Sequence, residues 1–220
     1  MHIDLSFFDL DGTLYPESSG LWLAIKQRID DYLLEKMGFE SQEAQQIRQK
    51  FLMKYGTTLR GLQLEYQIDT EEYLAFVHDL PLNKYLQPDP ALRQMLAELN
   101  IPKWIFTNSD INHVNNVLAF VGLQNLFEGI IEIHSLNFSC KPQDEAYQKA
   151  LAAAGRSSAK GCLFIDDSPA NIQTARRLGF TTVLISSHSQ DSVSEFTIGT
   201  IHDLPRLFPA LWPNNWEKEV

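Results

Sequence analysis

The first apolar run of the chain predicts a buried strand that ends in functional groups. Apolar residues occupy positions 3, 5, 7 and 8, and the run stops at Asp9, Asp11 and Gly12. Carboxylates at the end of a buried strand are costly to desolvate, yet the carboxyl edge of an open α/β sheet is where ligands bind. The segment 3–15 is therefore predicted to be a strand followed by a binding turn.

Between about residues 16 and 85 the apolar pattern is helical. Three helices are predicted, over about 21–37, 41–55 and 69–79. The first follows from apolar residues at every fourth position, and the last begins at Asp69, which fits a capping box with Glu72. The small, polar segment Gly56–Gly61 is expected to be a loop between helices. Residues 16–85 are thus predicted to be an all-helical insert.

From about residue 86 predicted strands and helices alternate. The strands are expected over about 103–106, 129–133, 162–165, 181–185 and 199–201, and the helices over about 90–99, 112–121, 142–154 and 169–178. This alternation predicts a parallel sheet with helices on both faces. The fold class is α/β, with a core of residues 1–15 and 86–220 interrupted by the helical insert 16–85.

Composition narrows the possible partners and the compartment. The 220 residues are 44% hydrophobic and 21% charged, as in soluble globular proteins. A net charge of −10 argues against nucleic acid polymers and acidic membranes, although a bound cation would admit a small anionic substrate. The two cysteines, Cys140 and Cys162, suggest no disulfide scaffold, and no signal segment or membrane-spanning run is evident. We expect a cytoplasmic protein, and the sequence does not indicate its oligomeric state.

Polar side chains follow four of the predicted strands. They are Asp9 and Asp11, Thr107 and Asn108, Lys141 in the third loop, and Asp166 and Asp167. In a parallel sheet these strand ends lie at one edge, so the groups are expected to converge. Carboxylates from two strands suit Mg²⁺, and a hydroxyl, an amide and a lysine suit the oxygens of a phosphate. The set predicts a magnesium-dependent phosphoryl-transfer site.

These motifs resemble those of the haloacid dehalogenase-like phosphatase superfamily. The matching segments, in order, are Asp9-Leu10-Asp11-Gly12-Thr13, Thr107-Asn108, Lys141-Pro142 and Ile165-Asp166-Asp167. The resemblance implies a Rossmann-like core, with the helical insert as a cap over the active site, and Mg²⁺ as cofactor. The dehalogenase branch lacks the second acid, which this chain carries as Asp11. Hydrolysis of a phosphate ester is therefore favoured over dehalogenation.

The resemblance implies the roles of Asp9 and Asp11 in the reaction. Asp9 is expected to be the nucleophile that forms an aspartyl-phosphate, with its other oxygen on the metal. Asp11 is expected to be the general acid/base, with its backbone carbonyl also a metal ligand. A carboxylate nucleophile divides hydrolysis into two in-line steps. Asn171 stands where some members carry another acid, and its role is left open.

The remaining core residues receive supporting roles from the same resemblance. Thr107 and the backbone of Asn108 are expected to bind phosphate, and Lys141 to hold Asp9 and phosphate together. Asp167 matches the direct metal ligand, and Asp166 is expected to act on the metal through water.

The insert is similar to the pyrimidine 5′-nucleotidase-like branch of the superfamily. The similarity lies in Tyr55-Gly56-Thr57-Thr58-Leu59-Arg60-Gly61-Leu62 and in Tyr15-Pro16. Members of that branch dephosphorylate nucleoside monophosphates such as UMP and CMP. Arg60 is expected to contact base, ribose or phosphate; the alternative is a solvated arginine in a helix–helix turn. The predicted function is hydrolysis of nucleoside 5′-monophosphates, with pyrimidines preferred.

Other functions stay open at this point. A phosphatase for phosphoglycolate or a sugar phosphate, or a phosphomutase, would carry the same core motifs. A phospho-accepting receiver-like domain also combines acidic residues, a threonine and a lysine, but it needs neither Asp11 nor a helical insert. Among the six histidines, His113 is interpreted as a surface or packing residue, and none of the others, His78 included, shows metal-ligand spacing.

Overall fold

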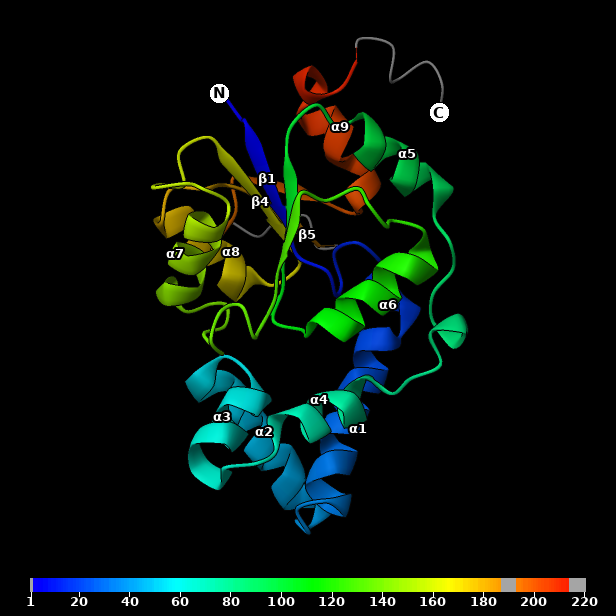
Figure 1. Cartoon of the computed structure of the whole chain (residues 1–220), viewed down its shortest axis with the longest axis vertical. Coiled ribbons are helices and arrows are strands. Elements are labelled where there is room, and N and C mark those ends of the chain that lie inside the picture. The colour runs from blue at the N-terminus through cyan, green and yellow to red at the C-terminus, as the bar shows by residue number, and fades with distance from the viewer. Residues whose placement is uncertain (1, 187–192, 214–220) are drawn as a thin grey trace.

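The structure, a computed structural model, describes residues 2–186 and 193–213. Within these ranges six parallel strands form one sheet in the order β3-β2-β1-β4-β5-β6, with β1 near its middle (Figure 1). The strands are β1 Leu5–Phe8, β2 Lys103–Phe106, β3 Gly129–Ile131, β4 Cys162–Asp166, β5 Thr181–Ile185 and β6 Phe196–Ile198. The predicted α/β class and parallel sheet are confirmed.

The register of the central strands sets the position of the first carboxylate. Phe8 pairs with Ile105 of β2 and with Ile165 of β4. Asp9 follows directly, and its backbone N–H donates to the Ile165 carbonyl at 2.9 Å. The carboxyl ends of β1, β2 and β4 therefore lie side by side, as expected at a ligand-binding edge.

Alternate strand residues feed two hydrophobic layers. Leu5 and Phe7 point into one cluster and Phe8 into the other, since successive side chains leave a strand on opposite faces. The Phe7 layer is covered by α7 Asp144–Ala153 and α8 Pro169–Arg177. The Phe8 layer is covered by α5 Pro90–Glu98, α6 Ile111–Val121 and α9 Leu204–Leu207. Both faces of the sheet are thus buried, as in parallel sheets generally.

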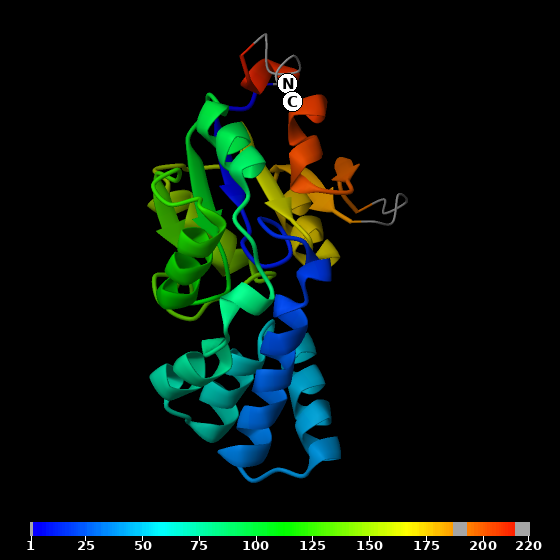
Figure 2. The ribbon, with the colours of Figure 1, turned by 90° about the vertical axis from the view of Figure 1, so that its right-hand side faces the viewer.

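The insert after β1 folds as a helical cap. Its helices are α1 Leu21–Glu35, α2 Ser41–Tyr55, α3 Thr58–Tyr66 and α4 Thr70–His78. They form a separate layer below the sheet, in blue to blue-green (Figure 2). Their apolar faces enclose a third cluster, which the core residues Ile133 and Cys140 also join. The cap is therefore packed against the core at this side.

One core loop anchors the cap by hydrogen bonds. The carbonyl of Tyr55, at the end of α2, accepts from Cys140 Sγ at 3.1 Å and from Gln143 Nε2 at 3.0 Å. Cys140 is fully buried. The end of α2 therefore rests on the loop that carries the predicted Lys141.

Three of the expected elements differ from the structure. The segment Gly56–Gly61 is a loop only at Gly56 and Thr57, because Thr57 Oγ1 accepts from Arg60 N–H at 3.1 Å and caps α3, which begins at Thr58. The last strand lies at Phe196–Ile198 rather than 199–201. The helix expected over 142–154 begins two residues later, at Asp144.

None of the helices in the described ranges combines the length and hydropathy that a membrane span requires.

Candidate active site

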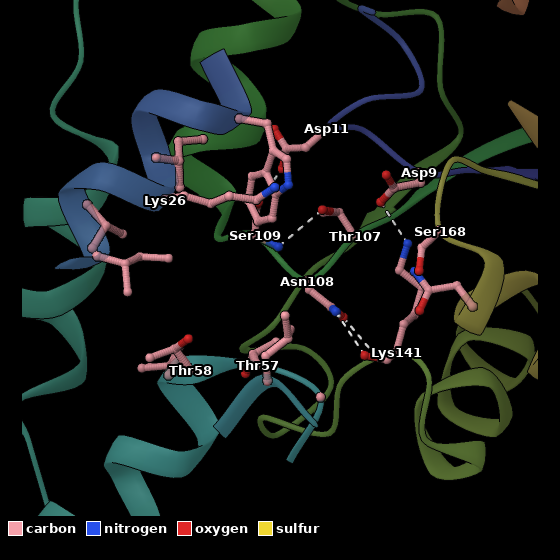
Figure 3. Close-up of a pocket in the computed structure, with 18 of the residues that line it drawn as sticks. Asp9, Asp11, Lys26, Thr57, Thr58, Thr107, Asn108, Ser109, Lys141 and Ser168 are labelled. Carbon is pink, nitrogen blue, oxygen red and sulfur yellow. Dashed lines mark hydrogen bonds and ion pairs between the residues drawn. The ribbon is translucent and has the colours of Figure 1, made fainter. Parts of the chain in front are cut away.

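A buried lysine joins the ends of three strands. Lys141 Nζ donates to Asp9 Oδ1 at 2.7 Å (Figure 3). It also donates to Asp166 Oδ2 at 2.7 Å and to the Phe106 carbonyl at 2.8 Å. Its side chain is 1% exposed. Burial lowers the pKa of Lys141, but the charges of Asp166 and Asp9 outweigh it and raise the pKa above its usual value. All three ammonium protons are used, so the lysine stays charged and fixed.

Asn108 fixes the loop that supplies this lysine. Its side-chain Nδ2 donates to the Lys141 carbonyl at 3.0 Å, and its Oδ1 accepts from the Lys141 N–H at 2.8 Å (Figure 3). Side-chain amides can replace a backbone partner in this reciprocal way. The end of β2 therefore sets the position of Lys141, a role for the Asn108 side chain that the sequence did not suggest.

Asp166 is held on both of its oxygens. Oδ1 accepts from the Ser168 N–H at 2.8 Å and from Asn171 Nδ2 at 2.9 Å, while Oδ2 accepts from Lys141 and, at 3.1 Å, from Asn171 Nδ2. Asp166 is fully buried. Its side chain orders Lys141, and Asn171, whose role was open, holds Asp166 in turn.

Three carboxylates form an oxygen-only cluster at the same edge. One oxygen each from Asp9, Asp166 and Asp167 lies within 4.8 Å of the others. Burial, despite the charge of Lys141, raises the pKa of Asp9 well above its usual value. Burial and the charge of Asp166 raise the pKa of Asp167 to about 7. The cluster holds more negative charge than Lys141 offsets, and its oxygen donors fit a hard divalent cation.

Gly12 makes room for Asp167. Its φ is +86°, and a Cβ there would lie 2.3 Å from Asp167 Oδ2. A side chain at this position would therefore displace the carboxylate from the cluster, which explains the glycine after Asp11 in physical terms.

Asp11 is oriented by three hydrogen-bond donors. Tyr15 Oη donates to Oδ1 at 2.5 Å, Ser109 Oγ donates to Oδ2 at 2.6 Å, and His113 Nε2 lies 2.7 Å from Oδ1. Because a carboxylate only accepts, Nε2 carries the proton. Burial opposes ionisation, but the charge of His113 and these hydrogen bonds outweigh it and lower the pKa of Asp11 below its usual value. The carboxylate is thus held ionised in one orientation.

His113, interpreted from the sequence as a surface or packing residue, does not lie on the surface. Its side chain is 2% exposed and lies between Asp11 and His78, on whose ring it stacks. Burial would lower the pKa of His113, but the charge of Asp11 raises it above the usual value. One signal was present in the sequence: Asp110 caps α6 directly after a site strand, which places His113, in the first turn, at the sheet edge.

A cavity of about 560 Å³ separates these groups from the cap. Its core lining includes Asp9, Asp11, Thr107, Asn108, Lys141 and Asp167. Its cap lining includes Trp22, Lys26, Arg48, Thr57, Thr58 and Tyr73. Lys26 Nζ lies 5.2 Å from the centre of the Trp22 ring, and Arg48 pairs with Asp30 at 2.6 Å. The pocket is therefore acidic on the core side, at Asp9 and Asp11, and carries Lys26 on the cap side (Figure 3). The cap side is otherwise partly apolar and also includes Arg48.

Arg60 does not line this pocket. Its guanidinium lies 3.4 Å from Gln63 Oε1 on the same helix. Because α3 begins at Thr58, the first helical turn turns Arg60 away while Thr57 and Thr58 line the cavity. At the start of α3 the cavity is therefore lined by Thr57 and Thr58 and not by Arg60.

The site is a cluster of carboxylates at the edge of a parallel sheet, and it faces a cavity beneath a helical cap. Residues 3–179 match the family of haloacid dehalogenase-like hydrolases. The chain belongs to this family.

The chain is also similar to individual proteins. The chain is 34% identical over 219 residues to phosphate metabolism protein 8 of Saccharomyces cerevisiae, covering 93% of this chain and 68% of that protein. Three solved structures share the fold. The L-2-haloacid dehalogenase of Xanthobacter autotrophicus aligns at 20% identity with a TM-score of 0.60, covering 94% of this chain and 98% of that one.

The other two solved structures are a phosphatase and a hydrolase. The HAD phosphatase of Thermococcus onnurineus aligns at 20% identity with a TM-score of 0.62, covering 93% of this chain and 97% of that one. The magnesium-bound HAD-hydrolase YfnB of Bacillus subtilis aligns at 18% identity with a TM-score of 0.65, covering 95% of this chain and all of that one. Dehalogenases and phosphatases share this fold, so the chemistry depends on the site residues.

Proposed function

We propose that the protein is a Mg²⁺-dependent phosphomonoester hydrolase that acts through an aspartyl-phosphate on nucleoside 5′-monophosphates, with pyrimidines preferred. One observation carries the reaction type. Asp9, bound to Lys141 through Oδ1, faces the same cavity as Asp11. A nucleophilic carboxylate and an acid/base carboxylate thus meet over one space that a phosphate ester can enter.

In the first step, Asp9 Oδ2 attacks phosphorus in line with the ester oxygen. The Asp9–phosphorus bond forms as the phosphorus–ester bond breaks, and Asp11 gives its proton to the leaving alkoxide. Asp11 is ionised in the free protein, but a phosphate dianion brought beside it disfavours its negative charge and thereby favours the protonated form. Lys141 holds Asp9 and offsets the charge of the entering phosphate.

In the second step, water attacks the aspartyl-phosphate. Asp11, left ionised by the first step, takes a proton from the water, and the new phosphorus–oxygen bond forms as the bond to Asp9 breaks. Thr107 and the Asn108 backbone bind the phosphate oxygens on the core side of the cavity. The products are phosphate and the dephosphorylated alcohol, and Asp9 is restored.

The acidic cluster would hold the metal. Asp9, Asp167 and the backbone carbonyl of Asp11 would be direct ligands, and Asp166, already bound on both oxygens, would act through water. Mg²⁺ in this position would offset the charge that develops on the phosphate. The relative from Bacillus subtilis is bound to magnesium, which supports this choice of ion.

The cap lining supports a substrate larger than phosphate itself. A volume of about 560 Å³ is in the range of small-molecule sites, and the hydroxyls of Thr57 and Thr58 suit the edge of a base. Lys26 suits a second polar or anionic group. Phosphoglycolate and sugar phosphates fit the same core, so substrate choice has to be measured.

The test is phosphate release with Mg²⁺ and with EDTA, comparing kcat/KM for UMP, CMP, AMP, phosphoglycolate, glucose 6-phosphate and p-nitrophenyl phosphate. Preference for UMP and CMP, lost in EDTA, is the expected result. A profile led by phosphoglycolate or a sugar phosphate would leave a phosphatase with another substrate. A stable acyl-phosphate without turnover would overturn the hydrolase and indicate a receiver-like protein.

A further inference from the structure

Two histidines, the half-buried His78 of the cap and the buried His113 of the core, lie face to face beside Asp11. The rings of His78 and His113 are stacked, with centroids 4.2 Å apart and planes at 21°. Their side chains are 12% and 2% exposed. His113 Nε2 lies 2.7 Å from Asp11 Oδ1, so the stack connects the cap to this carboxylate.

Each histidine occupies a fixed place in its own element. His78 is the last residue of α4, where the chain leaves the cap, and His113 is in the first turn of α6. Asp110 caps α6, since its Oδ1 accepts from the Asn112 and His113 N–H groups at 2.8 and 3.2 Å. The other Asp110 oxygen lies 2.5 Å from His78 Nδ1. Any shift of α4 relative to α6 must therefore break the stack and this polar contact together.

The chemistry of the pair points beyond packing. Two apolar rings would fill the same space without the cost of burying imidazole nitrogens. Here each ring places a nitrogen against a carboxylate, Asp110 for His78 and Asp11 for His113. Tyr15 and Ser109 hold Asp11 from the loops after β1 and β2, and His113 adds the donor that is in contact with the cap.

We propose that His113 is a positioning residue for Asp11, and that His78 makes this positioning depend on the seating of the cap. The inference rests on the proposed function, in which Asp11 protonates the leaving group. With the cap seated, the stack fixes His113 and His113 fixes Asp11. When the cap moves away, the stack opens and Asp11 loses one of its three fixed donors. Proton transfer is thereby coupled to closure of the pocket.

The test compares two esters in the Mg²⁺-loaded protein. p-Nitrophenolate leaves without a proton, whereas the alcohol of UMP needs one, so the ratio of kcat/KM for UMP to that for p-nitrophenyl phosphate reports on the acid. His113→Leu, which removes the donor, should lower this ratio about tenfold. His113→Gln, which keeps an N–H donor, should hold it within about threefold of wild type. His113→Asn, whose amide is too short to reach Asp11, should behave like His113→Leu.

The cap side has its own variants and a matched control. His78→Ala removes the stacked ring and should lower the ratio in the same direction, while His78→Phe keeps a ring on His113 and should preserve it. His134 also links core and cap, because its Nε2 lies 2.7 Å from Glu71 Oε1 of α4, but it has no contact with Asp11. His134→Ala should therefore leave the ratio unchanged.

The possible results distinguish a failure of the roles of His113 and His78 from a failure of the proposed phosphatase function. Equal loss on both esters in His113→Leu and His113→Asn would mean a structural role and overturn the positioning of Asp11. An unchanged ratio in folded His78→Ala would overturn the dependence on the cap. If wild type releases no phosphate from either ester, the proposed function fails. If Asp11→Asn slows both esters equally, its acid role fails, whatever the histidine variants show.

Discussion

Lys141 Nζ lies 2.7 Å from Asp9 Oδ1 at a position where the lysine side chain is 1% exposed. The same ammonium contacts Asp166 at 2.7 Å. One cation thus holds together two buried carboxylates from neighbouring strands, and the stability and the chemistry of the site depend on the same atom. Removing one partner of such a group leaves uncompensated buried charge.

Lys141→Met should therefore lose turnover and lower the free energy of unfolding by about 3–5 kcal/mol. Urea unfolding without metal measures the second effect. Lys54→Met is the control, because Lys54 pairs with Glu65 at 3.1 Å on the surface, where solvent screens the pair and its loss should change stability little. Equal stability of the two variants would contradict the dependence of the cluster on Lys141.

Asp9→Asn should abolish phosphate release while leaving the fold intact. The side chains are of equal size, but the amide cannot form the acyl-phosphate. Acid-quenched protein should carry labelled phosphate in wild type and none in the variant. Asp203→Asn, which changes a half-buried partner of the exposed Arg206, is the matched control. Unchanged turnover in Asp9→Asn would remove Asp9 as the nucleophile.

Gly12→Ala should lose both metal binding and turnover, because the added Cβ would displace Asp167. Gly122 has a similar φ, +84°, but nothing lies within 4 Å of its Cβ position. Both alanines should cost about 1–2 kcal/mol from left-handed backbone strain. Thermal unfolding with and without Mg²⁺ should show stabilisation by the metal in Gly122→Ala and none in Gly12→Ala; equal stabilisation would contradict the role of Gly12.

His78 should make stability depend on pH. Burial lowers its pKa below the usual 6.5, although Asp110 opposes the shift, and the charged groups that face it are Asp110, His113 and Asp11. Between the lowered pKa and 6.5 the unfolded chain binds a proton that the folded chain does not. The stability that the protein gains because His78 stays neutral in the folded state is therefore fully present above pH 6.5. It is lost as the pH falls below 6.5.

His78→Phe should remove that contribution and flatten the rise of Tm between about pH 5 and 7. Thermal unfolding of the metal-free protein across this range measures the slope. His202→Phe, which replaces an exposed histidine of the core, is measured beside it. A steeper rise of Tm with pH in His78→Phe than in wild type would contradict a lowered pKa of His78.

The core of the site could be predicted because parallel topology does the positioning. Asp9, Thr107 and Asp166 each end or follow a strand, and strands in one parallel sheet bring their carboxyl ends to one edge. The spacing of apolar residues predicted where these strands lie along the chain. The order of the strands in the sheet was not needed for this prediction. Local pattern and global fold agree at these positions, which is why short motifs were informative.

What the sequence did not predict depends on contacts between distant elements. Gly56 and Gly61 resembled loop residues, but Gly61 lies inside α3, where a Cβ would come 2.2 Å from Phe51 on α2. The glycine serves close helix packing, which a local pattern does not report. The sequence likewise did not predict that His113 contacts Asp11 and His78, because the tertiary fold brings these residues together.

The hydrogen bond from Cys140 Sγ to the end of α2 has a consequence for measuring motion. The thiol is sealed between cap and core, beside the loop of Lys141, so a thiol-specific reagent reaches it when the two parts separate. Cys162, buried at the start of β4 within the sheet, becomes reactive on unfolding instead. The labelling rates of the two cysteines therefore report two different events. Cys140 reports separation of the cap from the core, and Cys162 reports unfolding of the sheet, in the protein without substitutions.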